Sequence, residues 1–249
     1  MNDSDAPDFS RVAKEYGASR PGYPEELFAW LAGSVPRRET ALDAATGSGQ
    51  AAWGLAKHFD RVIAIDVSAE QLRHARGHPR IEYRVARAEA SGLPDGSVDL
   101  AVAAAAIHWF DRARFNDELR RVMRRGGVVA VWTYHVAHVD PPLEAILGAF
   151  YRDVVGPYYP PGVRLVDERY SGIELPGEEL TTPSFHASVR WNARQVASFV
   201  RTWSAVPIYI DATKRDPVPT LEAEVEAAFG GPDIARDLSF PLYLRAARL

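Results

Sequence analysis

The segment Leu42 to Asp66, LDAATGSGQAAWGLAKHFDRVIAID, constrains the fold most, because two short apolar stretches flank a glycine turn and a helical stretch. A buried strand, a glycine loop and a helix in this order are typical of the first unit of an open parallel sheet. The alternation continues, since apolar segments also lie at 81–85, 98–107 and 128–134 with polar or helical stretches between them. The sequence therefore predicts an α/β domain with right-handed crossovers.

The last hundred residues follow a different pattern. We expect a helix over 142–155, an irregular stretch rich in proline and glycine up to about 184, a strand over 185–191, helices over 192–205 and 220–229, and a closing strand over 238–249. The fold class that we predict is α/β: a Rossmann-like, doubly wound, mostly parallel seven-stranded sheet with helices on both faces and an antiparallel last strand. The whole chain, 1–249, is expected to form one domain.

Composition excludes several classes of function. The net charge of -4 argues against a general affinity for nucleic acid, and the absence of cysteine excludes disulfides and thiolate metal sites. The polar, acidic first ten residues are unlike a secretory signal, and the longest apolar run is far shorter than the roughly 20 residues that span a bilayer. We therefore expect a cytoplasmic protein without a membrane partner; no pattern indicates its oligomeric state.

The glycine loop favours an adenosine-bearing cofactor. Gly47 and Gly49 let the backbone approach a ligand, and Asp66, about twenty residues on, can accept hydrogen bonds from ribose hydroxyls. Asp43 would repel a pyrophosphate but would suit a cofactor that carries an ammonium and a sulfonium group. No lysine of the chain has a tyrosine four residues before it, so the pair common in reductases is absent. An NAD(P)-dependent oxidoreductase remains the less favoured alternative.

Six motifs then share one resemblance. They are LDAATGSGQ, VIAIDVS, ARAEASGLPDGSVDL, AAIHWFD, LRRVMRRGGVVAVWTY and EYGASRPGYP. Together they resemble the class I S-adenosylmethionine-dependent methyltransferases, in particular the small-molecule branch that includes trans-aconitate methyltransferase. The resemblance covers residues 8–135 strongly and the final strands more weakly. It implies that residues 1–36 form a helical segment covering the cofactor and that residues 141–184 form an inserted cap over the acceptor site.

The resemblance also implies a set of site residues. S-adenosylmethionine is expected to contact Tyr16, Arg20, Asp43, Ala45, Thr46, Gly47, Gly49, Gln50, Asp66, Val67, Gln71, Ala88, Glu89, Ala105 and His108. Within this set the loop after the first strand holds the methionine half, Asp66 the ribose, Ala88 and Glu89 the adenine edge, and Arg20 the carboxylate. Ala45 departs from the family, which usually has glycine there; it fits if its φ is negative and weakens binding if it is not.

The acceptor is expected to be a small molecule with a carboxylate or a hydroxyl group. Methyl transfer by in-line displacement needs the acceptor held close and aligned, and His108 is the candidate base if a hydroxyl must lose its proton. We expect substrate contacts from Trp109, Tyr134, His135 and Arg164, with Arg169 and Arg190 as further candidates for binding an acid. His108 could instead only pack against the cofactor, and His135, His138 and Asp140 have a spacing that could suit a metal, although we expect none. A cofactor-binding protein without catalysis also stays open.

Overall fold

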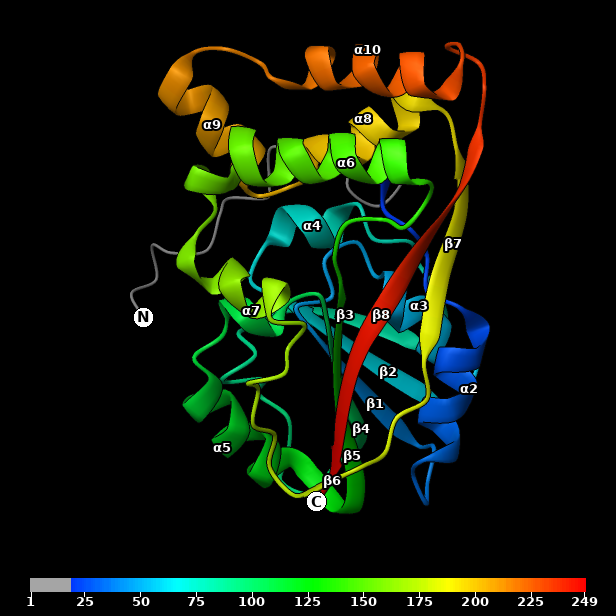
Figure 1. The fold of residues 1–249 in the computed structure, drawn as a ribbon. Coiled ribbons are helices and arrows are strands. Elements are labelled where there is room, and N and C mark those ends of the chain that lie inside the picture. The colour runs from blue at the N-terminus through cyan, green and yellow to red at the C-terminus, as the bar shows by residue number, and fades with distance from the viewer. Residues whose placement is uncertain (1–18) are drawn as a thin grey trace.

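Eight strands form one twisted sheet in the computed structural model, which describes residues 19–249 (Figure 1). The strands are β1 (Thr40–Ala44), β2 (Arg61–Asp66), β3 (Ile81–Val85), β4 (Val98–Ala104), β5 (Met123–Tyr134), β6 (Glu178–Glu179), β7 (Phe185–Trp191) and β8 (Arg236–Arg248). Their order is β3-β2-β1-β4-β5-β8-β6, and β7 pairs with another part of β8. β1 to β5 run parallel, whereas β6, β7 and β8 pair in antiparallel fashion. The predicted sheet is confirmed, with the short β6 as one strand more than expected.

The helices around the sheet explain its two-sided burial. They are α2 (Glu25–Gly33), α3 (Gln50–Leu55), α4 (Ala69–Arg73), α5 (Arg112–Val122), α6 (Pro141–Ala149), α7 (Arg164–Asp167), α8 (Ala193–Arg201), α9 (Ala205–Thr213) and α10 (Val218–Phe229). α2 and α3 belong to one apolar core and α5 to another, on opposite faces of the sheet. β1 and β4 are buried almost throughout because both faces are covered, as expected for a parallel sheet.

The second half of the chain is more helical than the sequence predicts. Short π and 3₁₀ turns link α6 to α7: η3 (Phe150–Val154), η4 (Gly156–Tyr158) and η5 (Pro161–Val163). A further 3₁₀ turn, η2 (Ile107–Trp109), follows β4. The single helix expected over 192–205 is wrong, because the chain turns at Thr202–Ser204 between α8 and α9. Proline and glycine at 156–163 therefore shape tight turns and not an unstructured loop.

The upper helices lie beyond the carboxyl ends of the parallel strands. Figure 1 shows α6, α8, α9 and α10 gathered above the sheet, while the C-terminal end of β8 lies at the bottom. Since β8 runs antiparallel to β5, the carboxyl ends of β1 to β5 point toward this helical layer. In an open α/β sheet ligands bind at that edge, so the fold places a site between the sheet and the helices.

Among residues 19–249, no helix combines the length and the apolar composition that a membrane crossing requires.

Candidate functional site

The loop after β1 turns tightly at two glycines. Gly47 has φ +56° and Gly49 has φ +86°, a backbone region that glycine adopts most easily. A Cβ atom on Gly49 would lie 2.4 Å from the hydroxyl oxygen of Tyr83, so no larger residue fits there without a shift. Gly49 then leads into α3, which begins at Gln50. The Gly47 amide donates to Asp66 and the Gly49 amide to the Thr46 carbonyl, so these bonds hold the tight turn at the carboxyl end of β1.

Asp43 lies fully buried below this loop. Its Oδ2 accepts hydrogen bonds from the Thr46 hydroxyl at 2.5 Å and from the Ala52 amide at 2.9 Å. Its Oδ1 is buried without a hydrogen-bond partner within the described residues. Burial raises the pKa of Asp43 to about 7, despite the two hydrogen bonds that favour the charged form. One carboxylate oxygen therefore stabilises the loop, and the other remains available to a polar ligand group.

Asp66 ends β2 and ties the glycine loop to that strand. Its Oδ2 accepts a hydrogen bond from the Gly47 amide and its Oδ1 one from the Ser68 amide, both at 2.8 Å. Burial raises the pKa of Asp66, although these amides favour the carboxylate. The next side chain, Val67, is 64% exposed although it is apolar. A carboxylate beside an exposed apolar side chain suits a ribose followed by an adenine.

Two alanines adopt left-handed backbone conformations at the carboxyl ends of adjacent strands. Ala45, after β1, has φ +57°, and Ala105, after β4, has φ +51°. The methyl group of Ala45 would fit without strain if φ were negative. The structure shows a positive φ there, so that condition is not met. Such conformations cost a residue with a Cβ atom about 1 kcal/mol and concentrate at functional sites. Both strained residues lie at the predicted ligand edge of the sheet.

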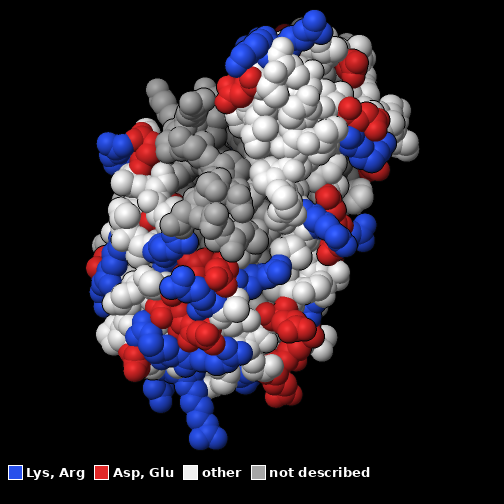
Figure 2. Space-filling model, turned by 90° about the vertical axis from the view of Figure 1, so that its left-hand side faces the viewer, with Lys and Arg blue, Asp and Glu red and all other residues white. Residues whose placement is uncertain are grey.

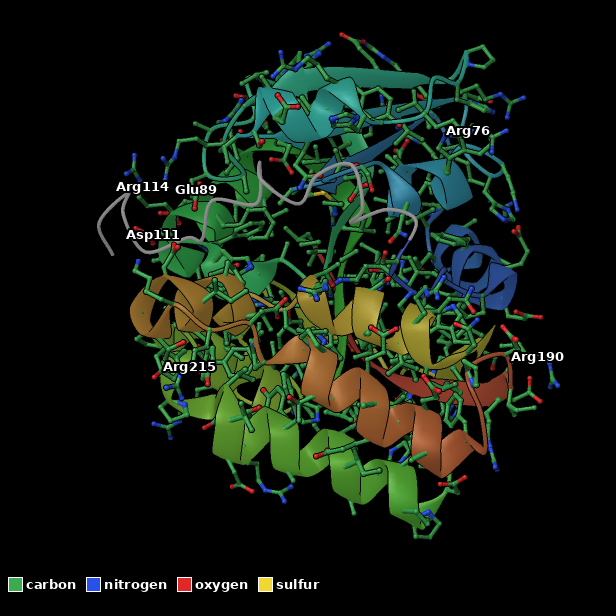
Figure 3. The ribbon with its side chains drawn as sticks, turned by 90° about the horizontal axis from the view of Figure 1, so that it is seen from above. Arg76, Glu89, Asp111, Arg114, Arg190 and Arg215 are labelled. Atoms are coloured by element: carbon green, nitrogen blue, oxygen red, sulfur yellow. The ribbon has the colours of Figure 1, made fainter. Side chains whose placement is uncertain are left out.

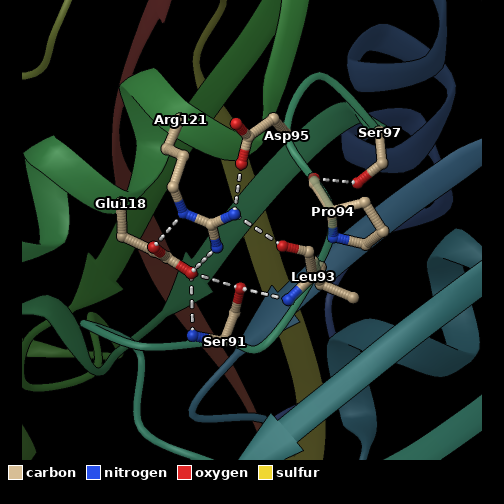
Figure 4. A network of polar contacts seen from close by, with 7 residues as sticks. All are labelled: Ser91, Leu93, Pro94, Asp95, Ser97, Glu118 and Arg121. Carbon is tan, nitrogen blue, oxygen red and sulfur yellow. Dashed lines mark hydrogen bonds and ion pairs between the residues drawn. The ribbon is translucent and has the colours of Figure 1, made fainter.

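The loop after β3 is fastened to α5 by buried polar contacts. Glu89 Oε1 accepts a hydrogen bond from the Asp111 amide at 2.9 Å, and Figure 3 shows the two residues side by side. Glu118 Oε1 accepts bonds from the amide and the hydroxyl of Ser91, and Arg121 holds the same carboxylate (Figure 4). These contacts set the position of Ala88 and Glu89 at the expected adenine edge. Gln71, on α4, is buried near Gly47.

A pocket with a cavity volume of about 90 Å³, partly open to solvent, lies at the ends of β4 and β5. It brings together six of the predicted site residues: Arg20, Ala105, His108, Trp109, Tyr134 and His135. Tyr16 lies outside the described residues. Arg164 does not line this pocket; its side chain is 82% exposed and pairs with Glu168, the residue that follows α7. Arg169 stacks on Tyr243 and Arg190 pairs with Asp237, so neither of them faces the pocket either.

His108 is held by the segment between η5 and β6. Its Nδ1 lies 2.7 Å from the hydroxyl oxygen of Tyr170, a fully buried residue with φ +60°. A Cβ atom on Gly162 would lie 2.4 Å from the His108 carbonyl oxygen, so glycine permits the close packing of η5 on η2. Burial and the charge of Arg20 lower the pKa of His108 to about 3. The imidazole is therefore neutral at physiological pH, and Nε2 is the ring nitrogen left for a ligand.

Arg20 joins the start of the described chain to β5 and α8. Its Nε donates to the Thr202 hydroxyl at 2.9 Å, its Nη2 to the Thr202 carbonyl at 3.0 Å and its Nη1 to the Tyr134 hydroxyl at 3.1 Å. The guanidinium also lies over the rings of Tyr134 and Phe199. Arg20 thus lines the pocket as a fixed positive charge.

The histidines after β5 point to different partners. His135 Nε2 lies 3.1 Å from Asp167 Oδ1, whereas His138 Nδ1 lies 3.2 Å from Glu144 Oε1. Asp140 caps α6 through the Leu143 amide. Among residues 19–249, no group of three or more histidine, aspartate or glutamate side chains is placed to hold a metal ion.

Known proteins match this arrangement. The methyltransferase domain family matches residues 42–131, the region of the glycine loop, Asp66 and β4. A solved structure from Anaeromyxobacter dehalogenans, provisionally named a type II methyltransferase, is 41% identical, with a TM-score of 0.84 over 92% of this chain and 97% of that one. The chain is a class I S-adenosylmethionine-dependent methyltransferase.

Two curated relatives of this methyltransferase extend the match along the chain. A Dictyostelium discoideum protein, provisionally named a methyltransferase, is 29% identical over 95% of this chain and 92% of its own length. A Saccharomyces cerevisiae protein, provisionally named an S-adenosylmethionine-dependent methyltransferase, is 26% identical over 76% of this chain and 77% of its own. The alignments therefore include the C-terminal half as well as the glycine-loop region.

The residues at the carboxyl ends of β1 and β2 fit S-adenosylmethionine. The unpartnered Oδ1 of buried Asp43, the positive φ values of Gly47 and Gly49, and the exposed Val67 beside Asp66 are what a charged methionine group and an adenosine require. Thr46 lies on the turn between β1 and α3, and Gln50 is the first residue of α3. That Asp43 and Asp66 hold the cofactor at this edge stays a prediction from the sequence.

Several pocket residues were not predicted from the sequence. They are Thr133, Val136, Tyr151, Tyr159, Val163, Val166, Phe199, Trp203 and Ser204. Tyr170, the partner of His108, was missed as well. The one signal for them was the density of aromatic residues in FYRDVVGPYYPPG and ASFVRTW. Nothing in those stretches told a pocket wall from an ordinary apolar core.

Proposed function

We propose that this methyltransferase transfers a methyl group to an oxygen atom of a small acceptor held in the pocket beside Ala105 and His108. The observation that carries the proposal is the position of that pocket. It opens at the ends of β4 and β5. The family resemblance places the methyl group at the end of β4, beside Ala105 and His108. The acceptor oxygen belongs to a carboxylate or a hydroxyl group, and an aliphatic acid of the trans-aconitate type falls within this class.

The protein's part in the reaction is to position the acceptor. S-adenosylmethionine, when bound, supplies a sulfonium methyl group whose carbon–sulfur bond breaks with the electron pair left on sulfur. The acceptor oxygen forms the new carbon–oxygen bond, and this in-line displacement requires the reacting atoms to be close and aligned. The residues that line the pocket, with Ala105 at its strained turn, provide that alignment.

His108 acts on the acceptor oxygen through Nε2. When Tyr170 donates its hydrogen to Nδ1, Nε2 carries a proton and donates a hydrogen bond to a carboxylate acceptor. When Nδ1–H donates to the tyrosine oxygen instead, Nε2 is a free base that takes the proton of a hydroxyl acceptor. The neutral state that burial imposes on His108 allows both tautomers, but the same lowered pKa makes Nε2 a weak base, which favours its hydrogen-bonding role toward a carboxylate or an already ionised oxygen. Tyr170 is thus a positioning residue for this histidine.

The segment 141–184 serves as the cap of the acceptor site. It contributes Tyr151, Tyr159, Val163 and Val166 to the pocket lining, and it carries Tyr170 behind His108. Figure 2 shows one face of the molecule. Acidic and basic side chains of the described residues are mixed in its lower part and sparse over much of its upper part. Such a surface favours a small-molecule acceptor over a nucleic acid.

The test is transfer of labelled methyl groups from S-adenosylmethionine to a panel of small acids and alcohols. We expect a methyl ester or ether product, and His108→Asn lowers kcat with S-adenosylhomocysteine affinity unchanged. Binding of S-adenosylhomocysteine without transfer to any acceptor would instead favour a cofactor-binding protein that lacks catalysis. Loss of cofactor affinity in His108→Asn would make the histidine part of the cofactor site alone.

A further inference from the structure

Five rings form a connected wall around one side of the pocket. We name this set the aromatic wall: Tyr134, Tyr151, Tyr159, Phe199 and Trp203. The ring of Tyr151 lies 4.8 Å from that of Tyr159 and 5.5 Å from that of Trp203 between centroids. Phe199 continues the wall, 5.7 Å from Trp203 and 6.3 Å from Tyr134. Rings packed against one another are rigid, so they form a preformed apolar surface.

The floor at the end of β4 adds further flat surface. Trp109 lines the pocket with its ring 4.5 Å from that of His108. Val163 and Val166 from the cap complete the apolar lining. Polar groups line the pocket as well, at Arg20, His108, Thr133, His135 and Ser204, but a carboxylate of an aliphatic polyacid that meets the rings instead has no partner there, which is costly when water is excluded. A planar ring instead gains contact area there.

The charge of the pocket opposes a cationic acceptor. Among the lining residues that the structure describes, Arg20 alone carries a permanent charge, and no aspartate or glutamate lines the pocket. An aromatic wall by itself would also attract an ammonium group. Here the Arg20 guanidinium already lies 5.9 Å from the Tyr134 centroid and 5.6 Å from the Phe199 centroid. Its charge also contributes to lowering the pKa of His108, whereas the Asp167 carboxylate behind the lining is bonded to the Tyr151 hydroxyl and lies 3.1 Å from His135 Nε2.

We propose that the acceptor is a planar aromatic compound with an acidic oxygen, a phenol or an aromatic carboxylate, whose ring packs on the aromatic wall. This inference rests on the proposed oxygen methylation. The acidic oxygen faces His108 and the methyl group, and Arg20 favours its anionic form. The proposed acceptor is aromatic, whereas the sequence resemblance implies an aliphatic acid.

Binding to the complex of the full chain with S-adenosylhomocysteine tests the proposal without turnover. The probes are 4-hydroxycinnamate, tyramine, which has the same phenol ring but an ammonium group, and tricarballylate, which has carboxylates but no ring. We expect 4-hydroxycinnamate to bind at least tenfold more tightly than either of the others by calorimetry. Equal or tighter binding of tricarballylate or tyramine, or no binding of 4-hydroxycinnamate, overturns the proposal.

A pair of variants at Tyr159 shows whether the wall makes the contact. Tyr159→Phe keeps the ring and removes only the hydroxyl, whereas Tyr159→Leu removes the ring. Because an aromatic pair adds about 0.5–1.5 kcal/mol to area burial, we expect Tyr159→Leu to weaken 4-hydroxycinnamate binding about two- to twelvefold. Tyr159→Phe should bind within about twofold of the wild type. Equal affinities of the two variants contradict a ring contact, provided both keep the wild-type affinity for S-adenosylhomocysteine.

Methyl transfer separates failure of this inference from failure of the proposed function. The same three probes, together with 4-hydroxybenzoate, are incubated with labelled S-adenosylmethionine. Methylation of an aromatic acid or phenol is expected. Transfer to tricarballylate alone overturns the aromatic acceptor and leaves oxygen methylation in place. Transfer to the amine of tyramine, in preference to any oxygen, counts against the proposed function itself.

Discussion

Most of the residues expected to hold the cofactor, here called the cofactor end, lie within one stretch of chain, from Asp43 to Glu89, whereas the acceptor pocket draws residues from Arg20 to Ser204. At the cofactor end the decisive contacts are carboxylates that accept hydrogen bonds from backbone amides of Gly47, Ala52 and Ser68. At the acceptor end they are rings packed on rings. The first arrangement suits one fixed ligand, and the second tolerates exchange of side chains.

This contrast decides what substitutions should do. A change at a buried carboxylate removes an electrostatic interaction in a place with little water, where such interactions are strong. A change in the aromatic wall removes part of a large contact surface, and neighbouring rings compensate in part. We therefore expect the largest effects, on stability and cofactor affinity, at the cofactor end.

Asp43→Asn should give the largest change. In the cofactor-free variant the free energy of unfolding should depend less on pH than in the wild type. Burial raises the pKa of Asp43 from 3.8 to about 7. The folded state thus binds more protons than the unfolded state between these values, and stability falls as pH rises from about 4 to 7. A pKa change of this size corresponds to about 4 kcal/mol. Asparagine does not ionise, so the variant should gain stability relative to the wild type over that range in urea unfolding.

Asp99→Asn is the matched control for a second buried acid. Asp99 accepts bonds from the Glu39 and Thr40 amides and pairs with Arg124, so its charge has a partner. Its removal should lower the free energy of unfolding at neutral pH, opposite in sign to Asp43→Asn. The free energy of unfolding of Asp43→Asn could instead equal that of the wild type at every pH. Ionisation of buried Asp43 would then not destabilise the folded protein, contrary to its raised pKa.

Asp66→Ala should weaken binding of S-adenosylhomocysteine about a hundredfold. The substitution removes the acceptor of the Gly47 and Ser68 amides, and hydrogen bonds to a charged group contribute about 1.5–3 kcal/mol each. It also removes the expected acceptor for the ribose. Calorimetry measures the affinity, and circular dichroism checks that the fold is retained. Asp60→Ala, an exposed acid just before β2, is the control and should bind normally; unchanged affinity in Asp66→Ala would remove Asp66 from the site.

The glycine loop, Asp66 and the edge of the sheet on which they lie were largely predictable from the sequence because their residues are local. Apolar strands that end in a glycine loop and in Asp66 fix both the parallel sheet and its ligand edge. The capping serine of α4, Ser68, is also a local signal, and its Oγ accepts the Gln71 amide. The φ of Ala45 was not predictable, because alanine carries no signal for a left-handed conformation.

The acceptor end was predictable only in part, since it depends on distant contacts. His108 and Tyr170 lie 62 residues apart and meet only after the cap folds onto η2. The sequence predicts that Arg164 binds the substrate because arginine binds acids. In the structure Arg164 lies on the outer face of α7, where its exposed side chain pairs with Glu168. Side-chain type indicates chemistry, whereas the direction of a side chain comes from packing that the sequence pattern does not contain.

Tyr170→Phe sharpens the comparison at the acceptor end. Removing the hydroxyl leaves His108 Nδ1 without its partner, and one such bond is worth about 1 kcal/mol, so kcat should fall about five- to tenfold. Affinity for S-adenosylhomocysteine should stay unchanged, because the lost hydroxyl is bonded to His108 at the acceptor end. Steady-state kinetics with separate kcat and KM values provide the measurement. Tyr209→Phe is the control, and an equal loss of cofactor affinity in Tyr170→Phe would indicate a structural role only.

Ala45→Gly should have the smallest effect on stability. The sign of that change tests whether the backbone at Ala45 is strained. At φ +57° glycine avoids the clash of the Cβ atom, which costs alanine about 1 kcal/mol or more. Glycine also makes the unfolded chain more flexible, which offsets part of this gain, so we expect a net increase in stability of about 0.5 kcal/mol. Ala44→Gly, one residue earlier in the extended strand β1, should instead lose about 0.5–1 kcal/mol. Cofactor affinity should be equal or higher in Ala45→Gly; a clear loss would show that the methyl group of Ala45 itself packs against the ligand.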